Sequence, residues 1–259
     1  MQVLQGIHDA ADCDDQVEMR LSYVPNGDER AAQALRLRRA NGVVLMGGSD
    51  RAFVQELIRL HIPVVLADQE HPGLPVDAVI SDNMAAGRAA VRYLLERGHR
   101  RIGWLGGPPI YTPNVERMEA VRLELLSAGL SLADRDCRIA SESTIPSYEE
   151  AMERWVETGD LPSAVIVCGS MPVPIVMHVL REHGLKCPRD ISLMCFDHDV
   201  YTSMSRPSPV TFASYPRDIG FRAMERLIHI ARAEQPEQPL KIVIPMKLVE
   251  GASVKGTCR

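Results

Sequence analysis

The strongest constraint on the fold is a regular alternation between short apolar runs and stretches with helical periodicity. Several runs, such as 43–46 and 63–66, are apolar at every position. Strands that are apolar on both faces are typical of a parallel sheet covered by helices on both sides. The expected strands are 17–24, 42–46, 62–67, 76–81, 101–105, 138–141, 163–167 and 191–196, followed by a late segment at 241–244.

This number of strands is large for one open sheet in a chain of 259 residues. Two lobes of about four to six strands each fit the length better. The alternation of strands and helices predicts the α/β class, with two doubly wound parallel-sheet lobes and right-handed crossovers. A cluster of glycine and proline at 106–109 follows one strand, and we expect a joint between the lobes there.

Composition excludes several classes of protein. The net charge is −5, and aromatic residues make up 5% of the chain, so it lacks the basic and stacking surfaces of a nucleic-acid binder. No apolar run approaches the roughly 18 residues of a membrane span, and the N-terminus does not resemble a signal peptide. The six cysteines contain no C-x-x-C pair, which indicates free thiols. We therefore expect a cytoplasmic protein.

Motifs of the common catalytic and nucleotide-binding classes are absent from the sequence, including G-x-S-x-G, the P-loop, H-E-x-x-H and G-x-G-x-x-G. Two short segments, Gly47-Gly48-Ser49 and Cys168-Gly169-Ser170, fit turns between a strand and a helix. Such turns can offer backbone amides to an anionic or hydroxylated ligand. An ordinary tight turn explains each of them equally simply.

Two acidic segments resemble metal-ligand clusters, namely 68–71 (Asp-Gln-Glu-His) and 197–199 (Asp-His-Asp). Adjacent residues of an extended segment point apart and rarely reach one ion, so we expect no metal site. Asp68 and Asp197 each follow an apolar strand directly. In open α/β sheets the carboxyl ends of the strands form the edge where ligands bind, so both aspartates are candidate ligand contacts.

A series of motifs along the chain resembles the LacI/GalR family of bacterial transcription regulators. Their order and spacing hold from Leu4 to Val254, so the resemblance covers nearly the whole chain. Each motif is weak alone, and the set is specific. The segments that carry it are Asp82-Asn83, 93–103, Gly106-Gly107-Pro108, Arg117, Gly129-Leu130, 184–193, Phe196-Asp197, 209–211, Tyr215-Pro216, Gly220, 244–249 and Ser253.

The resemblance implies a periplasmic-binding-protein-like effector domain, in which two lobes close on a small molecule and the chain crosses the hinge three times. We expect the crossings near Pro108, 211–213 and Leu240. The N-terminal lobe is then 1–107 plus 213–238, and the C-terminal lobe is 108–212 plus 239–259. The helix-turn-helix of the family and the first strand of its first lobe have no counterpart here. We interpret the chain as the effector-sensing part of a longer repressor that binds operator DNA through that missing segment and forms a homodimer.

The resemblance also implies an effector site. Arg117 matches the arginine that donates to ligand oxygens, Asp197 matches the carboxylate of the cleft, and Ser170 stands where the family usually has Asn-Asp or Asp-x. A carboxylate accepts hydrogen bonds from hydroxyl groups, and a guanidinium donates to oxygens. Because Ser170 lacks that charge, the effector is expected to be sugar-like or partly apolar, and plain hexoses to bind weakly. The implied effector-binding residues are Asp68, Tyr111, Arg117, Glu142, Ser143, Ser170 and Asp197.

Two other functions are compatible with such a fold. A solute-binding protein of a transporter shares the two-lobed architecture, although no export signal is visible. An α/β enzyme that uses Asp197 or Glu142 as a base is less well supported, because the sequence shows neither a nucleophile–base pair nor a cofactor motif. We therefore expect no catalytic residue, cofactor or metal.

Overall fold

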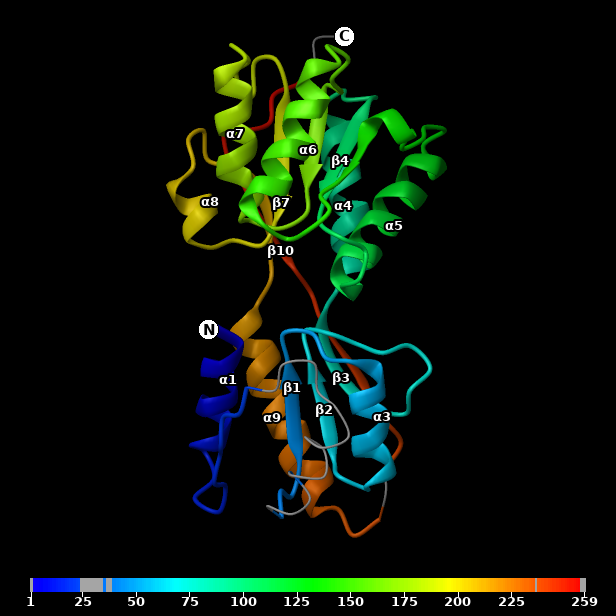
Figure 1. Ribbon diagram of the computed structural model, residues 1–259, viewed down its shortest axis with the longest axis vertical. Coiled ribbons are helices and arrows are strands. Elements are labelled where there is room, and N and C mark those ends of the chain that lie inside the picture. The colour runs from blue at the N-terminus through cyan, green and yellow to red at the C-terminus, as the bar shows by residue number, and fades with distance from the viewer. Residues whose placement is uncertain (1, 24–34, 36–38, 236, 257–259) are drawn as a thin grey trace. The chain divides into compact units, whose positions relative to one another are not determined.

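Two separate parallel sheets organise the chain (Figure 1). The computed structural model describes residues 2–23, 35, 39–235 and 237–256. Unit 1 comprises Met1–Ser81 and Tyr215–Ile244, and unit 2 comprises Asp82–Ser214 and Pro245–Arg259. The α/β class with parallel sheets is confirmed, and each unit has its own core.

The sheet of unit 1 has the order β1-β2-β3-β9, and all neighbouring strands are parallel. Alternate residues of a strand point to opposite faces, so Val65 packs with the helices of one face and Leu66 with the helix of the other. Helices α1 and α9 cover the first face, and α3 covers the second. The bounds are β1 Val43–Met46, β2 Val64–Ala67, β3 Asp77–Ser81, β9 Lys241–Ile244, α1 Gln2–Ala11, α3 Arg51–Arg59 and α9 Pro216–Arg232.

The sheet of unit 2 has the order β10-β8-β7-β6-β4-β5, in which only β10 is antiparallel to its neighbour. Trp104, Ile166 and Phe196 pack against α4 and α5, whereas Leu105, Val167 and Cys195 pack against α6 and α7. The strands are β4 Ile102–Gly106, β5 Cys137–Ile139, β6 Ala164–Val167, β7 Ser192–Phe196, β8 Val210–Ala213 and β10 Lys247–Val249. The helices are α4 Asn83–Glu96, α5 Thr112–Ser127, the 3-10 turn η1 Asp134–Asp136, α6 Ile145–Glu157, α7 Pro172–Glu182 and α8 Val200–Met204.

The expected lobe boundaries differ from the two units. Strand β4 pairs with β5 and β6, so residues 82–107 belong to unit 2, and β9 pairs with β3, so 241–244 belong to unit 1. The glycines and prolines of 106–109 form a strand-to-helix turn of unit 2 and not a joint. The chain crosses between the units at 81–82, 214–215 and 244–245, where neither glycine nor a proline cluster marks the passage.

The described part of the expected strand at 17–24 forms no strand. Residues 17–23 take part in neither sheet, and residue 24 lies outside the described residues. Val17 and Met19 instead pack against the core beneath α1 and α9. Their period-two spacing therefore comes from packing on helices and not from a ladder of hydrogen bonds with a neighbouring strand.

Two further properties bear on function. Within the described ranges, no helix combines the length and the apolar character needed to cross a membrane. The five cysteines in that part of the chain are free thiols, which agrees with the interpretation from their spacing.

Candidate functional site

Strand order places a ligand-binding edge in unit 2. The chain runs from β4 outward to β5 and then returns to the other side of β4, where β6 begins the opposite series. Such a reversal leaves a crevice outside the carboxyl ends of the two strands that flank it, here β4 and β6. Gly107 follows β4, and the turn 168–171 follows β6. The residues around these two turns form the candidate site.

An ion pair between Arg117 and Asp197 is the main charged feature beside this edge. The Nη1 atom of Arg117 lies 2.9 Å from Oδ2 of Asp197, and Nη2 lies 3.3 Å from Oδ1, which makes the pair bidentate. Arg117 is only 5% exposed, and its guanidinium lies 4.8 Å from the ring centroid of Phe196. The arginine therefore combines a charge-assisted pair with a cation–π contact in a largely desolvated position.

Three further side chains hold this pair in place. Nε of Arg117 donates to Oδ1 of Asn83 at 2.8 Å, and the Asn83 amide in turn donates to Glu116 at 2.9 Å. Ser214 donates its hydroxyl to Oδ1 of Asp197 at 2.9 Å. Asp197 itself has φ +67, a conformation that turns the chain at the end of β7.

Asn83 is not among the effector-binding residues that the resemblance implies, although Asp82-Asn83 is one of the segments that carry it. Asp82 is the cap, because its carboxylate accepts from the Ala85 N–H at 2.9 Å. Asn83 is the first residue of α4 and is 2% exposed. A second polar residue directly after a cap, at a position that the helix buries, is the only local signal that could have indicated this role.

A second group of polar side chains surrounds Gly107. A Cβ atom at this position would lie 2.6 Å from the hydroxyl of Tyr148, 3.1 Å from Oγ of Ser143 and 3.3 Å from Nδ2 of Asn114. Only glycine leaves room for these three groups. The thiol of Cys168 donates to Asn114 at 3.3 Å, and burial raises its pKa to about 11. This side of the site therefore offers neutral hydrogen-bonding groups next to the charged pair.

Comparisons with known proteins show which family the chain belongs to. The family model described as "Periplasmic binding protein-like domain" matches residues 91–254, which include every residue of the site except Asn83. The chain belongs to this family. The match agrees with the resemblance expected from the sequence motifs.

Curated relatives of this periplasmic-binding-protein-like chain are regulators. It is 24% identical over 233 residues to HTH-type transcriptional regulator DegA of Bacillus subtilis, covering 88% of this chain and 68% of that protein. It is 28% identical over 225 residues to HTH-type transcriptional regulator CelR of Thermobifida fusca, covering 85% and 65% respectively. The chain thus spans about two thirds of the length of these relatives.

Solved structures share the fold. A putative LacI transcriptional regulator from Bacillus cereus subsp. cytotoxis superposes with a TM-score of 0.89 at 20% identity, covering 99% of this chain and 92% of that one. A complex of the transcriptional regulator CelR with cellobiose gives a TM-score of 0.86 at 23% identity, covering 97% and 78%.

The structure separates the seven residues expected from the resemblance. Arg117 and Asp197 are in direct contact, and Ser143 lies beside Gly107 in the same unit. Tyr111 precedes α5 and is exposed, and Glu142 is also exposed, with its N–H donating to Ser147 Oγ at 3.2 Å. These residues stay predictions as effector contacts.

Ser170 and Asp68 have other surroundings. Ser170 is buried, and its hydroxyl donates to Oδ2 of Asp199 at 2.6 Å. Asp199 also caps α8 by accepting from the Tyr201 N–H at 2.9 Å, so Ser170 ties the start of α7 to α8. Asp68 lies in unit 1, at the end of β2 and with φ +57. In the part of the chain that the structure describes, no three His, Cys, Asp or Glu side chains are arranged to hold a metal ion.

Proposed function

We propose that this chain is the effector-sensing and dimerisation domain of a LacI/GalR-like transcriptional repressor. The effector is a small molecule, and an attached helix-turn-helix segment contacts operator DNA. The proposed activity belongs in the cytoplasm, where that DNA is found. The observation that carries the proposal is the Arg117–Asp197 pair at the reversal of strand order in unit 2. The curated regulators among the relatives support the same conclusion.

The pair suits an effector that carries hydroxyl groups. Asp197 has 32% of its side chain exposed, so it can accept from a ligand hydroxyl while Arg117 stays buried behind it. Ser143 and Tyr148 add neutral hydroxyl groups, and Tyr111 adds an exposed aromatic face. We propose Asp68, Tyr111, Arg117, Glu142, Ser143, Ser170 and Asp197 as the effector-binding set. The effector is sugar-like or partly apolar, because Ser170 offers no charge and its hydroxyl already binds Asp199.

Ligand coupling follows from different affinities for two states of the protein. A ligand hydroxyl that binds Asp197 competes with Ser214, which lies directly before the second crossing between the units. Only a ligand that binds one conformation more tightly can shift the balance between conformations, and hence the DNA affinity of the attached segment. The competition at Asp197 supplies such a difference.

The effector site can be tested by a thermal-shift screen of plain hexoses, cellobiose, nucleosides and phenyl glycosides, followed by calorimetry on each compound that stabilises the protein. We expect plain hexoses to bind with dissociation constants in the millimolar range or weaker, about −4 kcal/mol. For the compound that binds best, Asp197→Asn and Arg117→Met should each weaken affinity by about 30-fold or more, about 2 kcal/mol.

The matched control is Arg122→Met, which removes an exposed guanidinium from the same helix α5 and should leave the affinity unchanged. A compound whose affinity is the same for wild type and for both site variants would contradict the proposed site.

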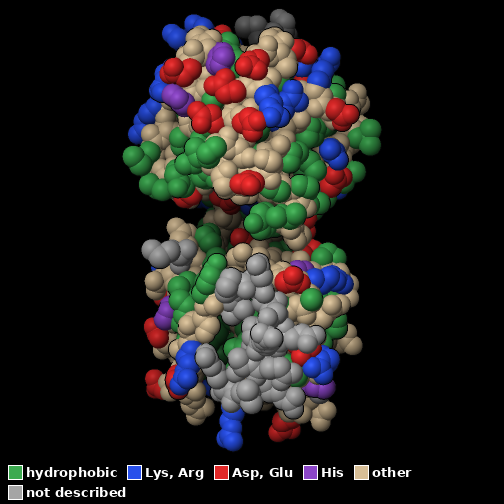
Figure 2. All heavy atoms as spheres, viewed as in Figure 1, with side chains coloured by type: hydrophobic (Ala, Val, Ile, Leu, Met, Phe, Trp, Pro, Cys, Tyr) green, Lys and Arg blue, Asp and Glu red, His purple; other side chains and the backbone are tan. Residues whose placement is uncertain are grey.

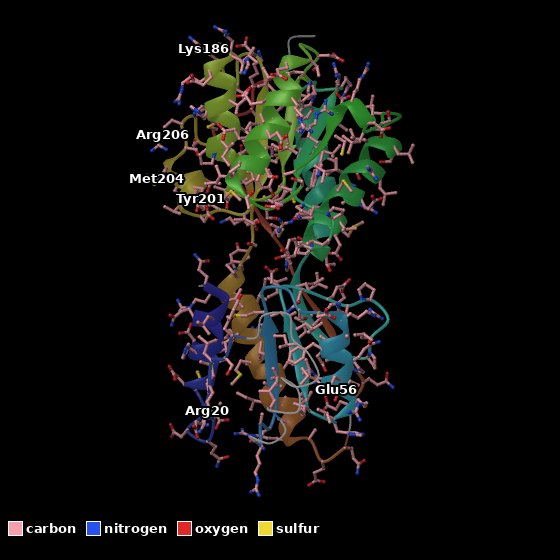
Figure 3. The ribbon with its side chains drawn as sticks, in the orientation of Figure 1. Arg20, Glu56, Lys186, Tyr201, Met204 and Arg206 are labelled. Atoms are coloured by element: carbon pink, nitrogen blue, oxygen red, sulfur yellow. The ribbon has the colours of Figure 1, made fainter. Side chains whose placement is uncertain are left out.

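Self-association of the chain has support in an exposed apolar surface on α8. Tyr201 and Met204 point away from the body of unit 2 on the same side, together with Arg206 (Figure 3). Hydrophobic side chains gather over α8 in the space-filling view (Figure 2), and Val200, Tyr201 and Met204 are all exposed. Contiguous exposed apolar side chains are typical of protein–protein contacts. We propose this surface as part of the homodimer contact.

Light scattering tests the dimer. The chain should have a mass near twice 28.7 kDa, and Met204→Glu should shift it toward the monomer, because it places a charge in an apolar contact. Leu126→Glu is the matched control, since Leu126 is 68% exposed and Met204 is 76% exposed, but Leu126 lies on α5. A monomer at tens of micromolar, or equal effects of the two variants, would contradict the proposed contact.

A further inference from the structure

A buried histidine joins the C-terminal segment of the chain to the amino edge of the unit 2 sheet. His99 precedes β4, and residues 254–256, which we call the strap, follow Ser253. The N–H of Lys255 in the strap donates to Oγ of Ser192, the first residue of β7, at 3.2 Å. Strands β4, β6 and β7 are parallel, so their amino ends lie at one edge. This edge is opposite the one that carries the candidate site.

Both nitrogens of the His99 imidazole have partners within the protein. Nε2 lies 2.9 Å from the carbonyl oxygen of Lys255, and Nδ1 lies 2.9 Å from Oγ of Ser163, the residue before β6. The same Oγ lies 3.0 Å from the carbonyl oxygen of Arg101. His99 itself has no exposed surface. The imidazole is therefore enclosed between the strap on one side and the start of β6 on the other.

The hydrogen bonds determine where the protons lie. A carbonyl oxygen only accepts, so Nε2 of His99 carries a proton. The single hydroxyl proton of Ser163 goes either to Nδ1 of His99 or to the Arg101 carbonyl. Neutral His99 needs this proton at Nδ1, and the Arg101 carbonyl then still accepts from the Ser163 N–H at 3.1 Å. The neutral imidazole is thus fully hydrogen-bonded while the strap is in place.

The charges around His99 oppose its ionisation. Burial lowers the pKa of His99, and the hydrogen bond to the Lys255 carbonyl offsets only part of this effect. The positive charges of Lys255 on the strap and Arg97 at the end of α4 lower the pKa further. From β4, the guanidinium of Arg101 is paired with two carboxylates, and from β6 the neutral hydroxyl of Ser163 faces the ring. The closed structure therefore keeps the imidazole neutral.

The strap is the part of this enclosure that can open by itself. Backbone ladders join β4, β6 and β7, whereas the strap is held by contacts of Lys255 and by the partly buried Val254. Ser253, directly before the strap, is anchored more firmly, because its Oγ donates to the Leu193 carbonyl and accepts from the Val210 N–H at 2.8 Å. Ser253 is therefore a fixed end from which the strap can detach.

We propose that His99 and the strap form a pH-sensitive latch, in which protonation of His99 accompanies release of residues 254–256 from the amino edge of unit 2. Release exposes the imidazole to water, where it takes up a proton as the pH falls through about 6.5. The closed form excludes that proton, so it is favoured above this pH and loses its advantage below it. The ratio of open to closed strap should then rise about tenfold between pH 7.5 and 5.5. The latch does not depend on the proposed effector site.

Hydrogen exchange at the Lys255 amide of the full chain measures the latch. Protection is the exchange rate of the same segment as a free peptide divided by its rate in the protein at the same pH, which removes the intrinsic pH dependence. Protection of the strap should be at least about tenfold below that of peptides covering β4 and β6, because the strap opens without unfolding of unit 2. It should fall about tenfold between pH 7.5 and 5.5. Protection that does not change with pH, or that equals the protection of β4 and β6, would overturn the proposal.

Three variants separate the proton from the contacts of the strap. His99→Gln cannot take up the proton, so protection of the strap should stay constant between the two pH values. The matched control is His183→Gln, a half-exposed histidine of unit 2 that pairs with Glu153 at 2.6 Å, and it should respond as the wild type does. Ser192→Ala removes one contact of the strap, so it should lower protection equally at both pH values and keep the tenfold loss. A tenfold loss that persists in His99→Gln, or that disappears in His183→Gln, would overturn the proposal.

Discussion

The two sheets of the molecule end in polar groups of different kinds. Beside the edge in unit 2, full charges meet, and Arg117, Asp197, Asn83 and Ser214 satisfy one another. At the edge in unit 1, the hydroxyl of Ser49 donates to Gln69 at 3.0 Å and lies 3.1 Å from Nε2 of His71. Burial lowers the pKa of His71, so these three side chains are neutral at neutral pH, and the amide nitrogen of Gln69 remains unpaired. A buried charge without a partner costs far more than a buried amide without one. Buried charged groups at a sheet edge must therefore be paired within the protein, whereas a buried neutral amide at such an edge can remain without a hydrogen-bond partner.

This difference has a consequence for ligand binding. A ligand that reaches Asp197 exchanges one hydrogen bond for another, because Arg117 and Ser214 already donate to that carboxylate. The amide nitrogen of Gln69 has no partner, so a hydrogen bond formed there would replace none. When a ligand replaces a hydrogen bond to a charged group, the protein discriminates between ligands, because a ligand that fits poorly leaves the charge without a partner. A hydrogen bond newly formed by a neutral group adds affinity, and a ligand that fits poorly leaves no charge without a partner.

The largest expected effect comes from breaking the charged edge. Asp197→Ala leaves the buried guanidinium of Arg117 without its carboxylate, so the free energy of unfolding of unit 2 should fall by about 2–3 kcal/mol. The estimate is at the low end for buried pairs because the Asp197 side chain is 32% exposed. Urea unfolding followed by tryptophan fluorescence measures it. Both tryptophans of the chain, Trp104 and Trp155, lie in unit 2, so the signal reports on that unit alone.

The control for this prediction is an exposed pair on the same helix as Arg117. Glu119 and Arg122 are each nearly half exposed, so Glu119→Ala should change the free energy of unfolding by less than about 0.5 kcal/mol. If Asp197→Ala were no more destabilising than Glu119→Ala, the pair would be solvated in solution and the contrast between the two edges would disappear.

The sequence predicts strands correctly where an unbroken apolar run marks them. The runs at 43–46, 64–67 and 164–167 are strands, because an unbroken apolar run suits a sheet covered on both faces. The resemblance implies Arg117 and Asp197 as effector contacts, which stays a prediction; the structure adds that these two side chains, 80 positions apart, contact each other. Periodicity alone contains no information on which strands share a sheet. The boundary near 107 was wrong for that reason, since the placement of β4 depends on its pairing with β6.

The polar side chains at the edge of unit 1 show the same limit, because the sequence pattern does not reveal which of them contact one another. The segment Gly47-Gly48-Ser49 was interpreted as a strand-to-helix turn and Asp68 as a candidate ligand contact, yet nothing local indicated that Ser49 reaches Gln69, 20 positions later. Ser170 stays a prediction as an effector contact, and the fold gives it a partner that nothing local in the sequence indicated. Ser170 follows β6, and its hydroxyl donates a hydrogen bond to the carboxylate of Asp199, which follows the neighbouring strand β7. A polar residue at a sheet edge has several possible partners, and only the fold selects one.

The smallest expected effect compares one histidine from each unit. His99 in unit 2 is fully buried, with Nδ1 2.9 Å from Ser163 Oγ and Nε2 2.9 Å from the Lys255 carbonyl. Burial lowers its pKa below the ordinary value of 6.5, and the charges of Lys255 and Arg97 act in the same direction. The folded protein therefore keeps His99 neutral, whereas the unfolded chain takes up a proton as the pH falls through about 6.5. The contribution of neutral His99 to the free energy of unfolding is therefore fully present above about pH 6.5 and decreases as the pH falls below that value.

At pH 6 this single ionisation can lower the free energy of unfolding by at most about 0.8 kcal/mol relative to pH 7.5. The loss should be smaller in His99→Gln, which cannot take up the proton. His71→Gln should leave it unchanged, since the pKa of His71 is also lowered but the residue lies in unit 1, outside the reach of the tryptophan signal. Urea unfolding at the two pH values, read by tryptophan fluorescence in all three proteins, checks the prediction. An identical pH dependence in wild type and His99→Gln would show that His99 protonates equally in the folded and unfolded states. A changed dependence in His71→Gln would show that the two units do not unfold as separate bodies, and that the contrast between their edges must be measured by a probe of each unit.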